Sequence, residues 1–109
     1  MDFKELLQFI DKQDGKLIKS YESGHDKEKR VLARAVKLAE ETGELCSEAL
    51  SYNKNQRQEK LDNHSANSLA NEVADVIITT MLLAKTTDVD IETALKNKIE
   101  KINKRFENI

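Results

Sequence analysis

Residues 71–84, NEVADVIITTMLLA, decide the fold class of this chain. After Asp75 the stretch is apolar almost all the way round a helix, and a helix of that kind is buried on most of its sides. Glu72 and Asp75 stand three residues apart, so their side chains project from the same helical face. The stretch predicts a central helix, beginning near residues 65–68 and ending near Thr87, with an acidic pair in its first half.

Three further amphipathic helices are predicted around this central one. The first has Asp2 and Glu5 in capping-box register and is expected to end near Ser23 and Gly24. The second covers about residues 26–53, and the fourth begins after a cap pair formed by Thr87 and Asp90. The second helix has a predicted packing seam, in steps of four and three, at Val31, Ala35, Leu38, Thr42, Leu45 and Ala49. Residues 52–67 are polar and are predicted to form a mobile connection.

Composition agrees with an all-α, four-helix bundle-like fold. The 109 residues contain no proline and three glycines, so little interrupts the helical periodicity. They amount to a single domain, residues 1–109, whose core is small. Because four helices cannot cover every side of the central one, we expect a homo-oligomer, either a dimer or a tetramer.

Charge and hydropathy argue against several classes of partner. A net charge of −2 gives no broad attraction to nucleic acid or to an anionic membrane. No apolar run approaches the roughly 20 residues that span a bilayer, and no secretion signal is visible. The single cysteine, Cys46, forms no intrachain disulfide and is expected to be a buried thiol in a reducing cytosol. The sequence therefore predicts a cytoplasmic protein that binds neither nucleic acid nor membrane.

Two acidic pairs form the candidate site. Glu41 and Glu44 repeat on the second helix the three-residue step of Glu72 and Asp75, and Glu41 lies roughly 40° from the seam residue Leu45. On antiparallel neighbouring helices the two pairs could converge. Four converging carboxylates repel one another, and a divalent cation removes that conflict.

The metal that such a site would hold follows from its ligands. Oxygen ligands suit hard cations, and Mg²⁺ commonly shares its coordination sphere with substrate phosphates, with Mn²⁺ as an alternative. Asp75, which stands between apolar neighbours, is expected to be buried, where an acid is costly unless it is paired or metal-bound. The residues thus predict metal-dependent phosphate chemistry.

Two segments, KLAEETGEL (37–45) and NEVADVIITTMLLA (71–84), together resemble the paired E-x-x-E and E-x-x-D signature of the MazG-like all-α nucleoside triphosphate pyrophosphohydrolases. The segment ALKNKIEKINKRF (94–106) is similar to the basic closing helix of that family, so the resemblance covers roughly residues 28–106. It implies a MazG-type fold and hydrolysis of a nucleoside triphosphate to a monophosphate and pyrophosphate, with cleansing of the nucleotide pool as one role.

The resemblance also implies roles for individual residues. The matches to the family's Mg²⁺ ligands are Glu41, Glu44, Glu72 and Asp75. The implied catalytic residues are Glu40 and Glu41, where Glu40 matches an acid considered as the water-activating base. The implied substrate-binding residues are Lys37, Lys98 and Arg105.

Other functions are compatible with parts of the pattern. A non-catalytic helical adaptor or oligomerisation module with surface acids would explain the seams, but it would not explain Asp75 among apolar residues. A di-iron carboxylate bundle needs two E-x-x-H motifs, and only Glu22 to His25 has that spacing. Thr79 and Thr80 stand where the related phosphoribosyl-ATP pyrophosphohydrolases usually carry Tyr-His, which argues against histidine biosynthesis.

Overall fold

A computed structural model of the chain describes residues 1–58 and 64–108, and within them it contains four α-helices and no strand. The helices are α1 (Phe3–Ser20), α2 (Lys27–Gln58), α3 (His64–Thr86) and α4 (Ile91–Arg105). The predicted all-α class is confirmed. In this part of the chain, no helix has both the length and the hydropathy required to cross a lipid bilayer.

Side-chain caps define three of the helix starts. At the start of α2, the Asp26 carboxylate accepts a hydrogen bond from the Lys29 backbone N–H at 2.9 Å. The Asp2 carboxylate accepts a hydrogen bond from the Glu5 backbone N–H at 2.8 Å, as the capping-box register predicted. Asp90 caps α4 by accepting from the backbone N–H of Thr93 at 3.2 Å and from its hydroxyl at 2.9 Å. The predicted pairing of Asp90 with Thr87 is wrong, because the Thr87 hydroxyl donates back to the Leu83 carbonyl at 2.9 Å.

Two helix boundaries differ from the sequence prediction. Helix α1 ends at Ser20, before the predicted Ser23, and the chain then turns through Gly24, whose φ of 81° favours glycine. The polar segment 52–67 is helical at both ends, because α2 continues to Gln58 and α3 begins at His64; residues 59–63 lie outside the described part. This segment contains no glycine or proline, so its many straight-chain polar residues can extend a helix.

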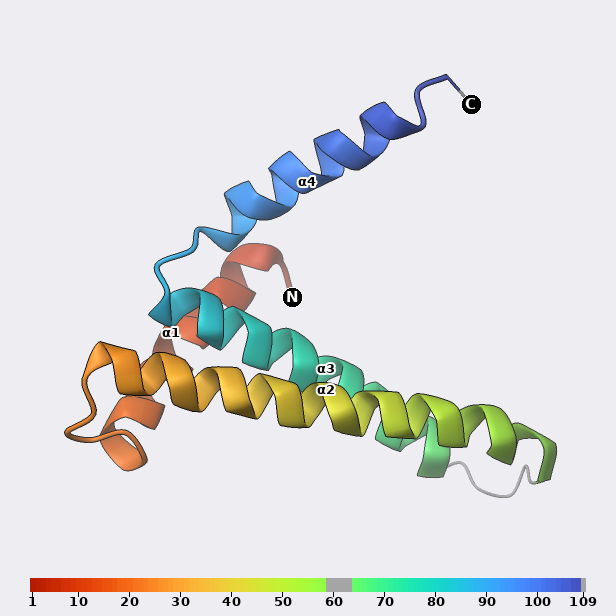
Figure 1. Cartoon of the computed structure of the whole chain (residues 1–109), viewed down its shortest axis with the longest axis horizontal. Helices are drawn as coiled ribbons and strands as arrows, with labels where there is room; N and C mark the ends of the chain where they lie inside the picture. The colour runs from red at the N-terminus through yellow and green to blue at the C-terminus, as the bar shows by residue number, and fades with distance from the viewer. Residues whose placement is uncertain (59–63, 109) are drawn as a thin grey trace.

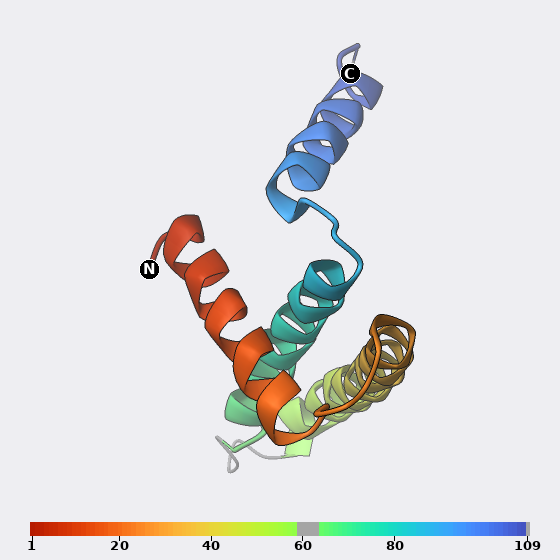
Figure 2. The same ribbon diagram turned by 90° about the vertical axis from the view of Figure 1, so that its left-hand side faces the viewer.

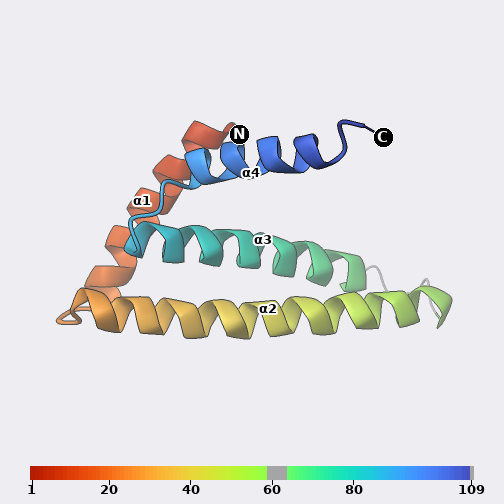
Figure 3. The ribbon, with the colours of Figure 1, turned by 45° about the horizontal axis from the view of Figure 1, so that its top comes forward.

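The helices are arranged around an antiparallel pair. Helices α2 and α3 lie side by side along most of their length (Figures 1 and 3), and α1 crosses the C-terminal part of α3 (Figure 2). Helix α4 leaves the end of α3 and projects away from the α2–α3 pair (Figures 1 and 2). The four helices of one chain therefore do not close into a bundle, because α4 is not packed along the others.

The apolar core lies where α1 meets α3. Its buried members are Ile10, Met81 and Leu82. Partly buried side chains packed against them are Phe3, Leu6, Leu7, Leu17, Ile78 and Ile91. The core fixes α1 across α3 and leaves the other half of the α2–α3 pair without a third layer.

Helix α3 is less buried than its composition predicted. Met81, Leu82 and Ala84 are buried, but Val73 and Ile77 are 43% and 49% exposed. The prediction of burial on most sides is wrong for a single chain, because α1 covers only the C-terminal part of α3 and α4 adds only its first residue, Ile91, to that same core. Apolar surface is left open beside the acidic half of the helix.

Arg34 of α2 is the most highly connected polar side chain of the described fold, and it is 3% exposed. Its Nη2 and Nε donate to Glu22 at 2.9 and 3.3 Å, a two-pronged contact with one carboxylate. Its Nη1 donates to Asp14 of α1, to the Thr86 hydroxyl of α3 at 2.7 Å, and to the Leu82 carbonyl at 3.2 Å. One guanidinium thus joins α1, the α1–α2 turn, α2 and α3.

This connection predicts a large loss of stability on truncation. Arg34→Ala should lower the free energy of unfolding by about 3 to 5 kcal/mol, since it leaves the buried carboxylate of Glu22 and the half-buried carboxylate of Asp14 unpaired. Arg34→Lys should also destabilise the fold, because an ammonium cannot reproduce the planar fork that contacts Glu22. Urea unfolding followed by circular dichroism measures both effects.

The matched control is Lys27→Ala, which removes an exposed ion pair with Asp88 and should have little effect on stability, because water and salt screen such a pair. An Arg34→Ala protein as stable as the Lys27→Ala protein would contradict the structural role given to Arg34.

Candidate metal centre

Three carboxylates from two helices meet in the middle of the α2–α3 pair. Glu41 of α2 and Glu72 and Asp75 of α3 each offer an oxygen atom, and these atoms all lie within 4.8 Å of one another. The grouping follows from local geometry, because the three-residue step puts Glu72 and Asp75 on one face of α3, and antiparallel packing places Glu41 opposite them. We call Glu41, Glu72 and Asp75 the carboxylate cluster.

The burial of the cluster differs from the prediction. Glu41 is the buried member at 8% exposure, Glu72 is half-buried and Asp75 is exposed. The expectation that Asp75 is buried is wrong, because the side of α3 that carries it is not covered by another helix of the same chain. The costly buried acid is instead Glu41, which lies on the face of α2 that packs against α3.

Glu44 lies at the edge of the cluster. It is exposed and does not belong to the group of three converging oxygen atoms, although the sequence placed it among the ligands. Its charge nevertheless acts on Glu72: burial raises the pKa of the Glu72 carboxyl, and the charges of Glu44, Glu41 and Asp75 raise it further. The folded chain therefore concentrates negative charge here at an electrostatic cost.

The protein offsets that cost only in part, through the ion pair of Lys37 with Glu41. The Oε2 atoms of Glu41 and Glu72 are buried, and no hydrogen-bond partner for either lies in the described residues. Buried carboxylate oxygens normally have partners. Converging oxygens with unused lone pairs and mutual repulsion suit a hard divalent cation, so the residues present fit Mg²⁺.

Lys37 is the one predicted substrate-binding residue that lies beside the cluster. Its Nζ is 3.3 Å from Glu41 and 3.4 Å from Glu40, and the hydrogen bond with Glu41 followed by the charge of Glu40 raises the pKa of Lys37. Glu40 itself is more than half exposed and lies outside the carboxylate cluster. The lysine therefore borders the carboxylate cluster on the side toward α1.

The two predicted basic residues of α4 are not brought to the site within one chain. Lys98 and Arg105 are exposed on a helix that projects away from the α2–α3 pair (Figure 2). A single chain supplies only Lys37 as a cation next to the carboxylate cluster among the predicted substrate-binding residues.

The sequence pattern did not predict that the packed face of α2 carries charged residues. Of the predicted seam, Val31, Leu38 and Leu45 are half-buried, but Ala35, Thr42 and Ala49 are exposed. The face that packs on α3 contains the buried Arg34 and Glu41, seven residues apart. A spacing of seven residues places both side chains on one face of α2, and this could have been read from the sequence. Charged residues on a helix are, however, usually assigned to its solvent-facing side.

A cavity of about 410 Å³ opens next to Lys37, and sequence reasoning gave no indication of it. It lies between α1, α2 and α3, and its lining residues are Gln13, Leu17, Tyr21, Glu22, Arg34, Lys37, Thr79 and Leu82. Lys37 belongs both to this cavity and to the border of the carboxylate cluster. The cavity and the cluster are therefore neighbouring parts of one surface.

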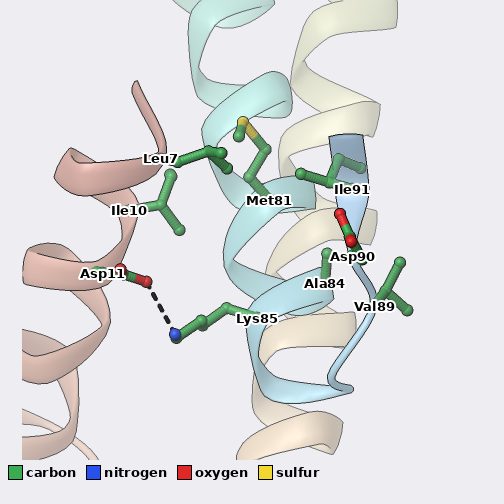
Figure 4. A pocket seen from close by; sticks show the side chains of 9 residues that line it. All are labelled: Leu7, Ile10, Asp11, Met81, Ala84, Lys85, Val89, Asp90 and Ile91. Atoms are coloured by element: carbon green, nitrogen blue, oxygen red, sulfur yellow. Dashed lines mark ion pairs between the residues drawn. The ribbon is translucent and has the colours of Figure 1, made fainter. Parts of the chain in front are cut away.

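A second cavity, of about 220 Å³, shares no lining residue with the first. Figure 4 shows the side chains around it. Leu7 and Ile10 of α1 and Met81 of α3 line it, and the ion pair of Asp11 with Lys85, 2.8 Å long, lies at its edge. It contains no member of the carboxylate cluster, and we assign it to the packing of α1 on α3.

Comparison with known proteins identifies the family of this chain. A family model for the MazG nucleotide pyrophosphohydrolase domain matches residues 30–109, a range that includes the carboxylate cluster, Lys37 and the whole of α4. Neither the search of curated proteins nor that of solved structures gave a match. Because the family match covers well over half of the sequence and contains the acids that converge in the fold, the chain belongs to the MazG nucleotide pyrophosphohydrolase family.

Proposed function

We propose that the chain is a Mg²⁺-dependent nucleoside triphosphate pyrophosphohydrolase that cleaves the bond between the α- and β-phosphates. The observation that carries the proposal is the carboxylate cluster with its unpartnered buried oxygens, inside a domain of the nucleotide pyrophosphohydrolase family. In the cell it would remove unwanted (d)NTPs from the nucleotide pool of the cytoplasm.

The proposed metal ligands are Glu41, Glu72 and Asp75, with Glu44 at the edge of the site. When bound, Mg²⁺ or Mn²⁺ would neutralise the acids and the substrate phosphates and make the phosphorus easier to attack. Glu41 and Glu72 come from different helices and each has a buried oxygen available, so they are positioned to hold the cation between α2 and α3.

The reaction consumes one water molecule. The water oxygen forms a bond to phosphorus, the bridging oxygen between the α- and β-phosphates leaves with pyrophosphate, and the water gives up a proton. We propose that either Glu40 or Glu41 accepts that proton. Glu41 lies in the cluster, and Glu40 is the neighbouring carboxylate that shares Lys37 with it.

Lys37 has a role that follows from its present partners. It now offsets the charge of Glu41 and Glu40 from a side chain that is 56% exposed. A cation bound to Glu41 would take over that task, and the ammonium would become available to a phosphate oxygen. Lys37 is therefore proposed to bind the triphosphate once the carboxylate cluster is neutralised.

Assembly is proposed to complete the site. Helix α4 and its C-cap residue present Leu95, Ile99 and Phe106 with exposures of 46%, 55% and 59%, and the outer side of α2 exposes Leu32, Val36 and Leu50. The single cysteine, Cys46, is exposed on the same side of α2, so the predicted burial of its thiol is wrong. Apolar patches of this extent are rare on monomers. We propose a homodimer or homotetramer in which a second chain covers these faces and α4 contributes Lys98 and Arg105 to a phosphate site.

The metal site predicts a stability response to Mg²⁺ alone. Mg²⁺ should raise the melting temperature of the wild-type protein, with a stabilisation of about 2.7 kcal/mol at 100 times Kd. Glu72→Gln should remove this response while leaving the metal-free protein as stable or more stable, because one of the repelling charges is gone. Differential scanning fluorimetry with and without EDTA measures both.

Glu100→Gln, on the exposed side of α4, is the control and should keep the full Mg²⁺ response. A normal response in the Glu72→Gln protein would exclude the proposed site, and no response in the wild type would favour a helical adaptor over an enzyme.

The scissile bond predicts the products. Incubation with (d)NTPs and Mg²⁺ should release a nucleoside monophosphate and pyrophosphate, and EDTA should stop the reaction. Asp75→Asn should lower kcat by at least about 100-fold, since the metal supplies several kcal/mol of transition-state stabilisation. Chromatography of nucleotides with separate assays for pyrophosphate and orthophosphate tests this, and orthophosphate as the first product would refute it.

The exposed apolar faces predict the assembly state. The wild-type protein should show a mass of at least twice 12.4 kDa in light scattering at micromolar concentration. Ile99→Glu should dissociate the assembly and reduce activity, because it places a charge in the proposed interface. Asn97→Glu, on the opposite side of α4, adds the same charge and should leave the assembly intact. A monomeric wild-type protein with full activity would rule out the arrangement.

A further inference from the structure

The cavity between α1, α2 and α3 lies next to the carboxylate cluster, one helical turn further along the α2–α3 pair. On α2, Lys37 precedes Glu41 by four residues, and on α3, Thr79 follows Asp75 by four. Since the helices are antiparallel, both steps lead in the same direction. At 1.5 Å per residue, the near edge of the cavity is on the order of 6 Å from the cluster along the helix axes.

This offset suits a nucleotide bound by its phosphates at the cluster. The ribose separates the base from the first phosphate by a comparable length. The cavity volume of about 410 Å³ leaves space for a flat heterocycle together with part of a sugar. A nucleotide whose phosphates reach the acids can therefore extend its base into the cavity.

The charges of the cavity argue against a second phosphate in it. Arg34, its deepest cation, is already engaged by Glu22 and Asp14, so that part of the wall has no cation to spare. Lys37, the other cation in its wall, lies on the side of the cluster. An anion bound deeper in the cavity would be repelled by the Glu22 carboxylate, whereas a neutral group would not be repelled.

The remaining wall combines apolar surface with polar groups of mixed type. Leu17 and the buried Leu82 supply apolar contact, and the exposed ring of Tyr21 lies at the rim, where it can stack on a flat ligand. The half-buried Gln13 and Thr79 add an amide and a hydroxyl, each of which can both donate and accept hydrogen bonds.

We infer that this cavity is the nucleoside subsite, in which Gln13 of α1 and Thr79 of α3 recognise the hydrogen-bonding edge of a neutral base. The inference rests on the proposed function and extends it, because it gives the enzyme a part that distinguishes nucleotides from other polyphosphates. Gln13 and Thr79 are then specificity-determining residues, and the carboxylate cluster recognises only the phosphates.

The test compares a triphosphate chain that carries a nucleoside with one that carries none. Calorimetry with Mg²⁺ measures the Kd of non-hydrolysable α,β-methylene analogues of the common (d)NTPs and of inorganic tripolyphosphate. The wild-type protein should bind its best nucleotide analogue at least about tenfold more tightly than tripolyphosphate, since only the analogue gains contacts in the cavity.

Thr79→Val and Gln13→Leu remove the polar groups, and Leu17→Trp fills the cavity. Each variant should weaken binding of the nucleotide analogue by about tenfold or more while leaving the Kd of tripolyphosphate unchanged. Thr80→Val and Gln8→Leu are matched controls on the same helices, outside the cavity, and should behave as the wild type. Thermal unfolding of each variant confirms that it is folded.

The possible outcomes separate the two proposals. If the wild type binds both ligands equally, or if the cavity variants lose tripolyphosphate as strongly as the nucleotide, the nucleoside subsite is overturned and the phosphate site stands. If the wild type binds neither ligand in the presence of Mg²⁺, the proposed function fails, and the subsite fails with it.

Discussion

The packing of α2 against α3 buries two charged side chains seven residues apart on the same face of α2, and the rest of the structure depends on how each is compensated. Arg34 is fully paired by Asp14, Glu22 and Thr86, so it joins three helices and a turn. Glu41 keeps a buried oxygen without a partner among the described residues and faces further acids. The charge of Arg34 is compensated within the chain, and this stabilises the fold. The charge of Glu41 is compensated only in part, which leaves room for a cation.

These two positions also set the geometry of the site. Arg34 holds α1 against the α2–α3 pair, which makes α1 one wall of the cavity beside Lys37. The same helix pair aligns Glu41 with Glu72 and Asp75 one turn further on. The buried ion pair of Arg34 forms part of the wall of the proposed subsite, and the acids next to it are the ones that would bind the phosphates through a metal.

One chain covers only part of its apolar surface. The core of α1 and α3 occupies one end of the molecule, and α4 exposes its apolar side to solvent. A domain of this size has little core to lose, and an uncovered amphipathic helix is poorly stabilised by itself. The proposed second chain would cover α4 and at the same time bring basic residues toward the acids, so that stability and activity would depend on the same contact.

The sequence by itself determined the local features: four helices, the Asp2 cap, and the three-residue spacing of the acidic pairs, since each depends on neighbours along the chain. It also indicated that the two acidic motifs would meet, because antiparallel packing is the simplest connection between them, but it did not show that Glu44 stays at the edge. Only the tertiary structure decided that Glu41 is buried and Asp75 exposed, that Arg34 has its partners on α1 and α3, and that α4 stands apart. Burial depends on which distant segment of the chain covers a helical face, and the periodicity of the helix itself does not identify that segment.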